Sequence, residues 1–272
     1  MQLKQSEPSL DRFIFFSGCG LLFSVVTPII LFPEAAAKTI NQIFDFLTTE
    51  LGILYVIAAI STLTILMVLA LGPLGKIRFG QSPPPYSRFS WIAMLFCCGI
   101  GASLIYWGAA EWVFYYESPP FGIAPRSEDA VLWASTYGMF HWGPAGWALY
   151  CLPAIAIGCS YHIRQRPSLK LSDACEPVLG YWSERWPGRI IDILFIIGLI
   201  GTASTGLALG TSVVASASTR ATGLEDGFTM QVVIVALATL TIAYSVYRGL
   251  DEGIKVLSIV NAVMALILIT FV

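Results

Sequence analysis

The chain reads Phe96-Cys97-Cys98-Gly99-Ile100-Gly101-Ala102-Ser103 in the middle of an apolar run, residues 90–112. A run of this length can cross the hydrocarbon core of a bilayer as a helix, which takes about 20 residues. Small residues let a second helix approach closely. They also weaken the helix, because glycine costs about 1 kcal/mol relative to alanine. The stretch therefore predicts a membrane helix and leaves close packing and local unwinding open as interpretations of its centre.

Six more apolar runs surround this one, at residues 13–32, 51–71, 139–160, 190–215, 230–247 and 254–272. Of the 272 residues, 56% are hydrophobic and 12% are charged, against roughly 25% charged in ordinary globular proteins. The runs are continuous and do not alternate, so helices are the structure that satisfies their backbone in lipid. We predict an all-α polytopic membrane protein with seven spans. The composition excludes a soluble enzyme, a nucleic-acid-binding protein and a disulfide-rich secreted domain.

The basic residues predict the orientation of these spans. With the N-terminus inside, the outer segments hold three basic residues, Lys38, Arg126 and Arg220, and the inner segments hold the other twelve. Inner loops of membrane proteins carry the excess of Lys and Arg. We therefore expect a cytoplasmic N-terminus. The last run reaches Val272 without a polar cap, so we also expect the sequence to be the N-terminal part of a longer protein.

The run at 139–160 opens with Phe140-His141-Trp142-Gly143-Pro144, and Trp147 and Tyr150 follow. On a continuous helix Trp142 and Tyr150 differ by about 80° in azimuth and about 12 Å in height, so they share a broad face. Aromatic faces attract a cation whose charge is spread over methyl groups. Membrane-interface anchoring and core packing are the alternatives.

A few polar residues in the other runs are candidates for binding an ion or a neighbouring helix. Thr202 could contribute an oxygen ligand to a hard cation, although such hydroxyls often bond to their own helix. Asn261 lies well inside the last run, where we expect a buried amide with a partner on a neighbouring helix or a nearby ion. Asp192 lies close to Arg189, and we expect a local ion pair.

A membrane-embedded enzyme would need paired catalytic groups within the spans, and only Glu111 stands clearly there. We therefore expect a protein that is not an enzyme.

Several segments resemble the betaine/carnitine/choline transporter (BCCT) family. They are Gly99-Ile100-Gly101-Ala102-Ser103, Tyr106-Trp107-Gly108-Ala109-Ala110-Glu111, Ser118-Pro119-Pro120-Phe121-Gly122, Phe140-His141-Trp142-Gly143 with Trp147 and Tyr150, Gly201-Thr202-Ala203, and residues 253–261. These segments occur in family order and cover most of the chain from residue 90 onward.

The resemblance implies a LeuT-like inverted-repeat transporter fold. Residues 1–88 would hold the cytoplasmic N-terminus and two peripheral transmembrane helices. Residues 89–272 would form the first five-helix repeat, with the second repeat absent from this sequence. The resemblance also implies a multi-pass protein of the bacterial inner membrane, a homotrimer, and contact with membrane lipid but not with nucleic acid.

The resemblance further implies a set of site residues. Trp142 and Tyr150 match positions of the aromatic box that binds trimethylammonium compounds. Residues 99–103 match the unwound segment, in which Ile100, Gly101, Ala102 and Ser103 would face the substrate. Candidate ligands for a coupling Na⁺ are Cys97, Ile100, Thr202 and Asn261. Neither a cofactor nor a resident metal is expected.

Two departures from the family pattern bear on substrate and coupling. Betaine-type members carry Gly-Met-Gly-Ile-Gly where this chain has residues 99–103, which leaves the substrate open among glycine betaine, choline and carnitine. Sodium-coupled members carry a threonine where this chain has Gly198, whereas Asn261 stands where sodium-independent exchangers have an arginine. The expected function is cation-coupled symport by alternating access, of use in osmoprotection. A sodium-independent exchanger, or a non-transporting sensor of the same fold, is the alternative.

Overall fold

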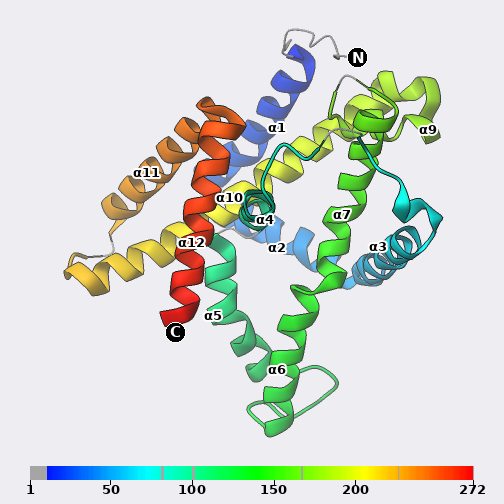
Figure 1. The fold of residues 1–272 in the computed structure, drawn as a ribbon. Coiled ribbons are helices and arrows are strands. Elements are labelled where there is room, and N and C mark those ends of the chain that lie inside the picture. Colours follow the sequence, from blue (N-terminus) through cyan, green and yellow to red (C-terminus); the bar gives the residue numbers. More distant parts are fainter. Residues whose placement is uncertain (1–10, 81–82, 100–101, 167, 226, 272) are drawn as a thin grey trace. The chain divides into compact units, whose positions relative to one another are not determined.

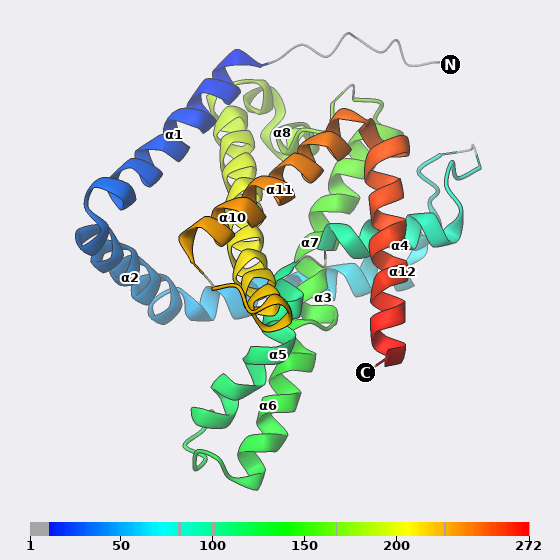
Figure 2. The same cartoon turned by 90° about the vertical axis from the view of Figure 1, so that its left-hand side faces the viewer.

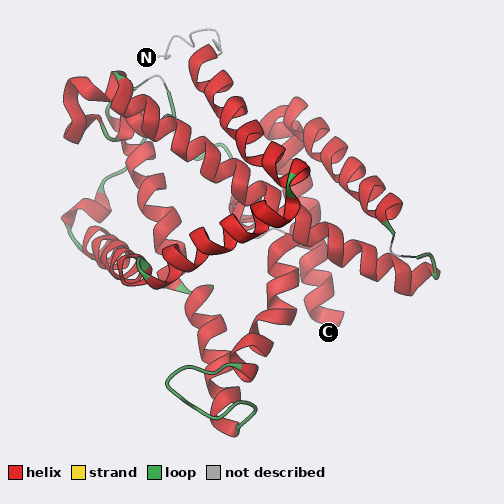
Figure 3. Cartoon of the chain, turned by 180° about the vertical axis from the view of Figure 1, so that it is seen from behind, coloured by secondary structure: helices red, strands yellow, loops and turns green. Residues whose placement is uncertain are grey.

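The computed structural model describes residues 11–80, 83–99, 102–166, 168–225 and 227–271, which form helices and loops without any strand (Figures 1 and 3). Its α-helices are α1 (Arg12–Leu31), α2 (Pro33–Thr49), α3 (Gly52–Leu71), α4 (Arg88–Gly99), α5 (Ala102–Glu117), α6 (Glu128–His141), α7 (Pro144–Gly158), α8 (Leu171–Ala174), α9 (Glu176–Leu179), α10 (Trp186–Thr222), α11 (Phe228–Tyr247) and α12 (Lys255–Phe271). Short turns of 3₁₀-helix, η1 (Pro73–Lys76) and η3 (Gly180–Glu184), and of π-helix, η2 (Cys159–Ile163) and η4 (Leu250–Ile254), connect them.

Six of the predicted spans correspond to helical stretches long and apolar enough to cross a membrane. These are Arg12–Leu31, Gly52–Leu71, Glu128–Ile163, Trp186–Thr222, Phe228–Tyr247 and Leu250–Phe271. The run at 90–112 is described as α4 and α5, and residues 100–101 between them lie outside the described part of the chain. The all-α polytopic membrane class is thus confirmed.

The sequence analysis did not predict α2. This helix starts directly after α1 because Pro33 occupies its first turn, where a missing N–H costs nothing. The backbone N–H of Phe32, between the two helices, donates to the carbonyl of Pro28 at 2.8 Å. The chain therefore turns from one helix into the next without a loop.

The chain forms two compact units, which are described separately. The first unit holds residues 1–81 and 136–200. In it α3 packs against α7, which it crosses (Figure 2). The ring of Phe79 covers Gly158 near the end of α7, where an added Cβ would lie 2.8 Å from the ring.

The second unit holds residues 82–135 and 201–272, and in it α4 packs against α12, which it crosses (Figure 2). Ala93 on α4 and Ser258 on α12 are both buried. The thiol of Cys97 donates to the carbonyl of Ser258 at 3.5 Å. Small side chains thus let the two helices come close.

Small residues dominate the buried positions throughout the described residues. The buried residues other than glycine are Ile14, Ala93, Ala130, Ala134, Ala148 and Ala215 together with Ser160, Ser172, Ser183, Asp192, Thr211, Ser245 and Ser258. No large side chain is fully buried in the described part of the chain, and the large apolar side chains point outward. This distribution is typical of helices that pack in lipid, where no hydrophobic force drives large side chains inward.

Candidate functional site

The aromatic residues predicted to form a binding site lie at an interruption between α6 and α7. Helix α6 ends at His141, Trp142 and Gly143 form a turn, and α7 begins at Pro144. Gly143 has extended backbone angles, φ −89° and ψ −164°. Proline has no N–H to continue the helix, and it clashes with the carbonyl four residues earlier. The residue pair Gly143-Pro144 therefore carries the signal for this interruption, which the sequence analysis missed.

The side chain of Trp147 stabilises the turn. Its indole Nε1 donates to the backbone carbonyl of Trp142 at 3.0 Å. In a continuous helix that carbonyl would accept from the N–H of residue 146. Gly146 lets α7 lie close to the carbonyl oxygen of His141, because a Cβ at position 146 would be 2.2 Å from that oxygen. Trp147 thus has a structural role in the turn.

Two of the three aromatic rings are paired in the first unit, and Trp142 precedes them in the turn. The ring of Trp147 lies 5.9 Å from that of Tyr150, centroid to centroid, with 47° between the planes. Trp142 is 37% exposed and Tyr150 is 65% exposed. Both rings therefore present surface that a ligand can contact.

The predicted placement of Trp142 and Tyr150 on one helix is wrong. The predicted azimuth of about 80° assumed that Trp142 and Tyr150 share one continuous helix. Trp142 instead precedes α7, in the turn. Its orientation is set by that turn and by the hydrogen bond from Trp147.

The predicted unwound segment is only partly described. Ile100 and Gly101 lie outside the described residues, and Ala102 and Ser103 open α5. Figure 2 shows α4 running across the view and α5 running down it, so the two are separate helices in the structure. Unwinding at residues 99–103 stays a prediction.

The candidate cation ligands are distributed over α4, α10 and α12. Cys97 on α4 reaches the backbone of α12 through its thiol, as described above. Asn261 is one helical turn beyond Ser258 on α12 and is exposed. Thr202 is exposed on α10, which does not pack closely along α4 or α12 in the described part of the chain. The structure therefore brings Cys97 near the Asn261-bearing helix and leaves Thr202 apart from both.

Asp192 has a different partner from the one predicted. Its carboxylate is buried, with 6% of the residue exposed. It accepts a hydrogen bond from the backbone N–H of Ser172 at 3.0 Å and another from the Ser172 hydroxyl at 2.8 Å. The predicted ion pair with Arg189 is thus wrong, since the carboxylate binds the first residues of α8. Asp192 fixes the segment around α8 to the start of α10.

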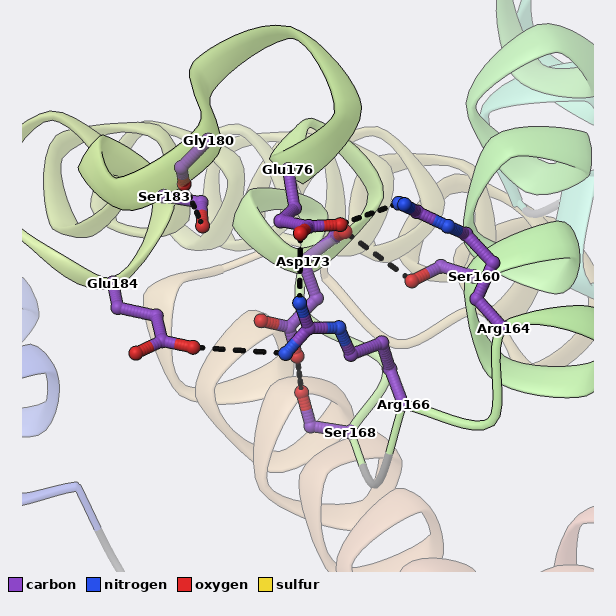
Figure 4. Close-up of polar contacts among 9 residues, drawn as sticks. All are labelled: Ser160, Arg164, Arg166, Ser168, Asp173, Glu176, Gly180, Ser183 and Glu184. Atoms are coloured by element: carbon purple, nitrogen blue, oxygen red, sulfur yellow. Dashed lines mark hydrogen bonds and ion pairs between the residues drawn. The ribbon is translucent and has the colours of Figure 1, made fainter.

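An ionic network holds the segment between α7 and α10 (Figure 4). The carboxylate of Glu176 pairs with Arg164 at 2.5 Å and with Arg166 at 2.9 Å. Arg166 also reaches Glu184 at 3.6 Å. The hydroxyl of Ser160 donates to the carbonyl of Asp173 at 3.2 Å. These contacts join η2 and the residues that follow it to α8, α9 and η3 within the first unit.

The geometry can be compared with known proteins. A family model described as "BCCT, betaine/carnitine/choline family transporter" matches residues 13–272. A carnitine transporter of Acinetobacter baumannii is 29% identical over 91% of this chain and 45% of its own length. A glycine betaine/proline/choline/ectoine transporter of Vibrio parahaemolyticus is 32% identical, over 95% and 47%. The high-affinity choline transport protein of Escherichia coli K12 is 32% identical, over 98% and 40%. The chain thus spans about half the length of the curated relatives it matches.

Proposed function

The chain belongs to the betaine/carnitine/choline transporter family, and from this premise we propose that it is part of a secondary transporter of quaternary ammonium compounds in a bacterial inner membrane. The substrate class is glycine betaine, choline or carnitine. Relatives named for these compounds support it, although an ectoine/hydroxyectoine transporter of Virgibacillus pantothenticus is also 28% identical. All these relatives are named as transporters, which supports a protein that is not an enzyme.

The observation that carries the proposal is the paired rings of Trp147 and Tyr150, next to the turn that holds Trp142. A trimethylammonium group cannot donate a hydrogen bond, so a site for it has to replace hydration by other means. Aromatic faces do so, with a contribution of about 2 kcal/mol or more where water is excluded. Trp142 and Tyr150 would contact the methylated head, and Trp147 would hold the Trp142 backbone in place through its Nε1 hydrogen bond.

The mechanism that fits this site is alternating access around a site at the membrane midplane. The backbone of Ile100, Gly101, Ala102 and Ser103 would approach the substrate where side chains are small. Cys97, Ile100, Thr202 and Asn261 would contribute oxygen ligands to a coupling Na⁺, with Cys97 and Ile100 doing so through carbonyls. Residues 1–88 would be peripheral, and residues 89–272 would be the first five-helix repeat of a homotrimeric protein.

An exchanger that needs no sodium is the second candidate. Gly198 favours it, because coupled members of the family carry a threonine there. Sodium-dependent net uptake would support symport, and sodium-independent exchange against internal substrate would support the exchanger. Binding without flux would indicate a sensor of the same fold.

Uptake of labelled betaine, choline and carnitine by the full-length protein tests the proposal. We expect Trp142→Leu to raise the KM roughly 30-fold, the equivalent of about 2 kcal/mol of lost attraction. Trp142→Phe should keep part of the affinity. Trp112→Leu, which removes an exposed tryptophan from α5, is the matched control and should leave the KM unchanged. If Trp142→Leu transports as the unmodified protein does, the aromatic site is refuted.

A further inference from the structure

A cleft in the first unit lies outside the proposed transport site. It has a volume of about 440 Å³ and lies where the chain leaves η3 and enters α10. Its lining is Tyr181, Trp182, Glu184, Arg185, Trp186 and Arg189. Three aromatic rings and two guanidinium groups therefore meet at one end of a membrane-spanning helix.

The shape of the cleft depends on a close contact at Gly188, in the first turn of α10. A Cβ at this position would lie 1.7 Å from the carbonyl oxygen of Ser183 in η3. Only glycine lets the η3 turn pack directly against the helix. This contact keeps Tyr181 and Trp182 of η3 next to Arg185 and Arg189.

The two arginines are free to bind an anion. Arg185 lies with its Cζ 4.5 Å from the ring centroid of Tyr181, and Arg189 lies 5.1 Å from the ring centroid of Phe13. Neither guanidinium has a carboxylate within salt-bridge distance among the described residues. Cation–π contacts orient a guanidinium without neutralising its charge.

The neighbouring carboxylates are already neutralised. Glu184, which lines the cleft, pairs with Arg166 at 3.6 Å (Figure 4). Asp11, which interacts electrostatically with Arg189, pairs with Lys170 at 3.3 Å. The surroundings of the cleft therefore keep a net positive charge.

The position of the cleft along α10 indicates the kind of anion. Arg189 directly precedes the apolar run at residues 190–215, so the cleft lies at the depth of lipid headgroups when α10 spans the bilayer. The rings of Tyr181, Trp182 and Trp186 are all exposed. Tyrosine and tryptophan concentrate at this depth because one end of each ring system is apolar and the other is polar.

We propose that this cleft binds the headgroup of an anionic phospholipid. Arg185 and Arg189 hold the phosphodiester with charge-assisted hydrogen bonds, which the planar guanidinium suits. Tyr181, Trp182 and Trp186 contact the glycerol and the first methylenes of the acyl chains. The bound lipid would fix the η3 turn, and with it the start of α10, to the membrane surface.

Lipid binding to the purified full-length protein, measured by native mass spectrometry, tests this proposal. The probes are dioleoyl phosphatidylglycerol, which is anionic, and dioleoyl phosphatidylcholine, which has no net charge. We expect tighter binding of phosphatidylglycerol. Each basic residue near the lipid contributes about a fivefold preference for the anionic headgroup. The double variant with Arg185→Gln and Arg189→Gln should therefore lower the preference for phosphatidylglycerol over phosphatidylcholine roughly 30-fold.

Two controls separate the site from general charge and from misfolding. Arg220→Gln removes the same charge at the other end of α10 and should keep the preference. Arg185→Lys with Arg189→Lys keeps the charge and should retain most of it, which shows that a loss in the glutamine variant is not caused by unfolding. An equal affinity for both lipids in the unmodified protein, or an equal loss in the Arg220→Gln variant, would overturn the proposal. So would displacement of phosphatidylglycerol by inorganic phosphate, which would indicate a site for a soluble anion.

Discussion

Trp147 makes the side-chain contact that closes the turn between α6 and α7. Its Nε1 donates to the Trp142 carbonyl at 3.0 Å. Trp147→Phe keeps an aromatic ring and removes the donor, so we expect a loss of about 1 kcal/mol of local stability. Hydrogen exchange should become faster at the amides of residues 142–147 and should be unchanged in α3. Unchanged exchange at the turn would show that the bond contributes nothing there.

Asp11 makes the start of α1 sensitive to pH. Its carboxylate accepts from the backbone N–H of Ile14 at 3.3 Å and pairs with Lys170 at 3.3 Å. The Ile14 hydrogen bond, with a smaller effect of Lys170, lowers the pKa of Asp11 below its ordinary value of 3.8. Both contacts stabilise the ionised form, so their contribution is complete above that ordinary value.

The contribution of Asp11 is therefore lost as the pH falls through the lowered pKa. We expect faster hydrogen exchange at Ile14 in strong acid, after correction for the intrinsic exchange rate. Asp11→Asn still caps the helix but does not titrate, so its exchange should lack this acid transition, whereas Asp11→Ala should lose about 1 kcal/mol of local stability above the lowered pKa. An acid transition that persists in Asp11→Asn would assign the effect to another group.

At the scale of helices, Pro144 decides whether α6 and α7 are one helix or two. Pro144→Ala supplies an N–H and removes the ring, and a helix-interior proline costs about 3 kcal/mol relative to alanine. We expect a continuous helix across Trp142 and Gly143, slower hydrogen exchange there, and loss of uptake because Trp142 changes direction. Pro33→Ala, at the first turn of α2, where proline is tolerated, should change neither. Normal uptake with a continuous helix would show that the turn is not needed for transport.

The sequence predicted the spans well because lipid leaves a helix as the structure that satisfies the backbone of a long apolar run. It failed at α2, whose residues are too polar for a span and whose start depends on Pro33. It also failed at the turn of Trp142, although the pair Gly143-Pro144 is a pattern that predicts a helix break. The length of the apolar run favoured one continuous helix, whereas the two helix-breaking residues within it decide the structure.

The partner of Asp192 could not be predicted from the sequence at all. Ser172 lies twenty positions earlier, and only the path of the chain through α8, α9 and η3 brings its hydroxyl to the carboxylate. Arg189 is the nearer basic residue in the sequence, but three positions along a helix do not guarantee a contact when one side chain is buried and the other points outward. Local spacing predicts helix faces, whereas buried polar pairs depend on the tertiary fold.

At the scale of the whole molecule, the distribution of Lys and Arg predicts a cytoplasmic N-terminus. Fusions of a reporter after residue 80 and after residue 225 test it. We expect green fluorescent protein to fluoresce at the first position, which is inside, and alkaline phosphatase to be active at the second, which is outside. The opposite pair of signals would reverse the orientation.

The seam between α4 and α12 includes the contact from Cys97 to Ser258, and the buried residues on these two helices are small, Ala93 on α4 and Ser258 on α12. None of these side chains interlocks with the facing helix as a leucine or phenylalanine would. Two helices that meet over such a smooth surface can shear by an ångström or two without changing rotamers, which is one of the recurrent ways in which packed helices move. The thiol-to-carbonyl contact is weak. The seam therefore offers little resistance to such sliding, and it keeps the two backbones at a constant separation.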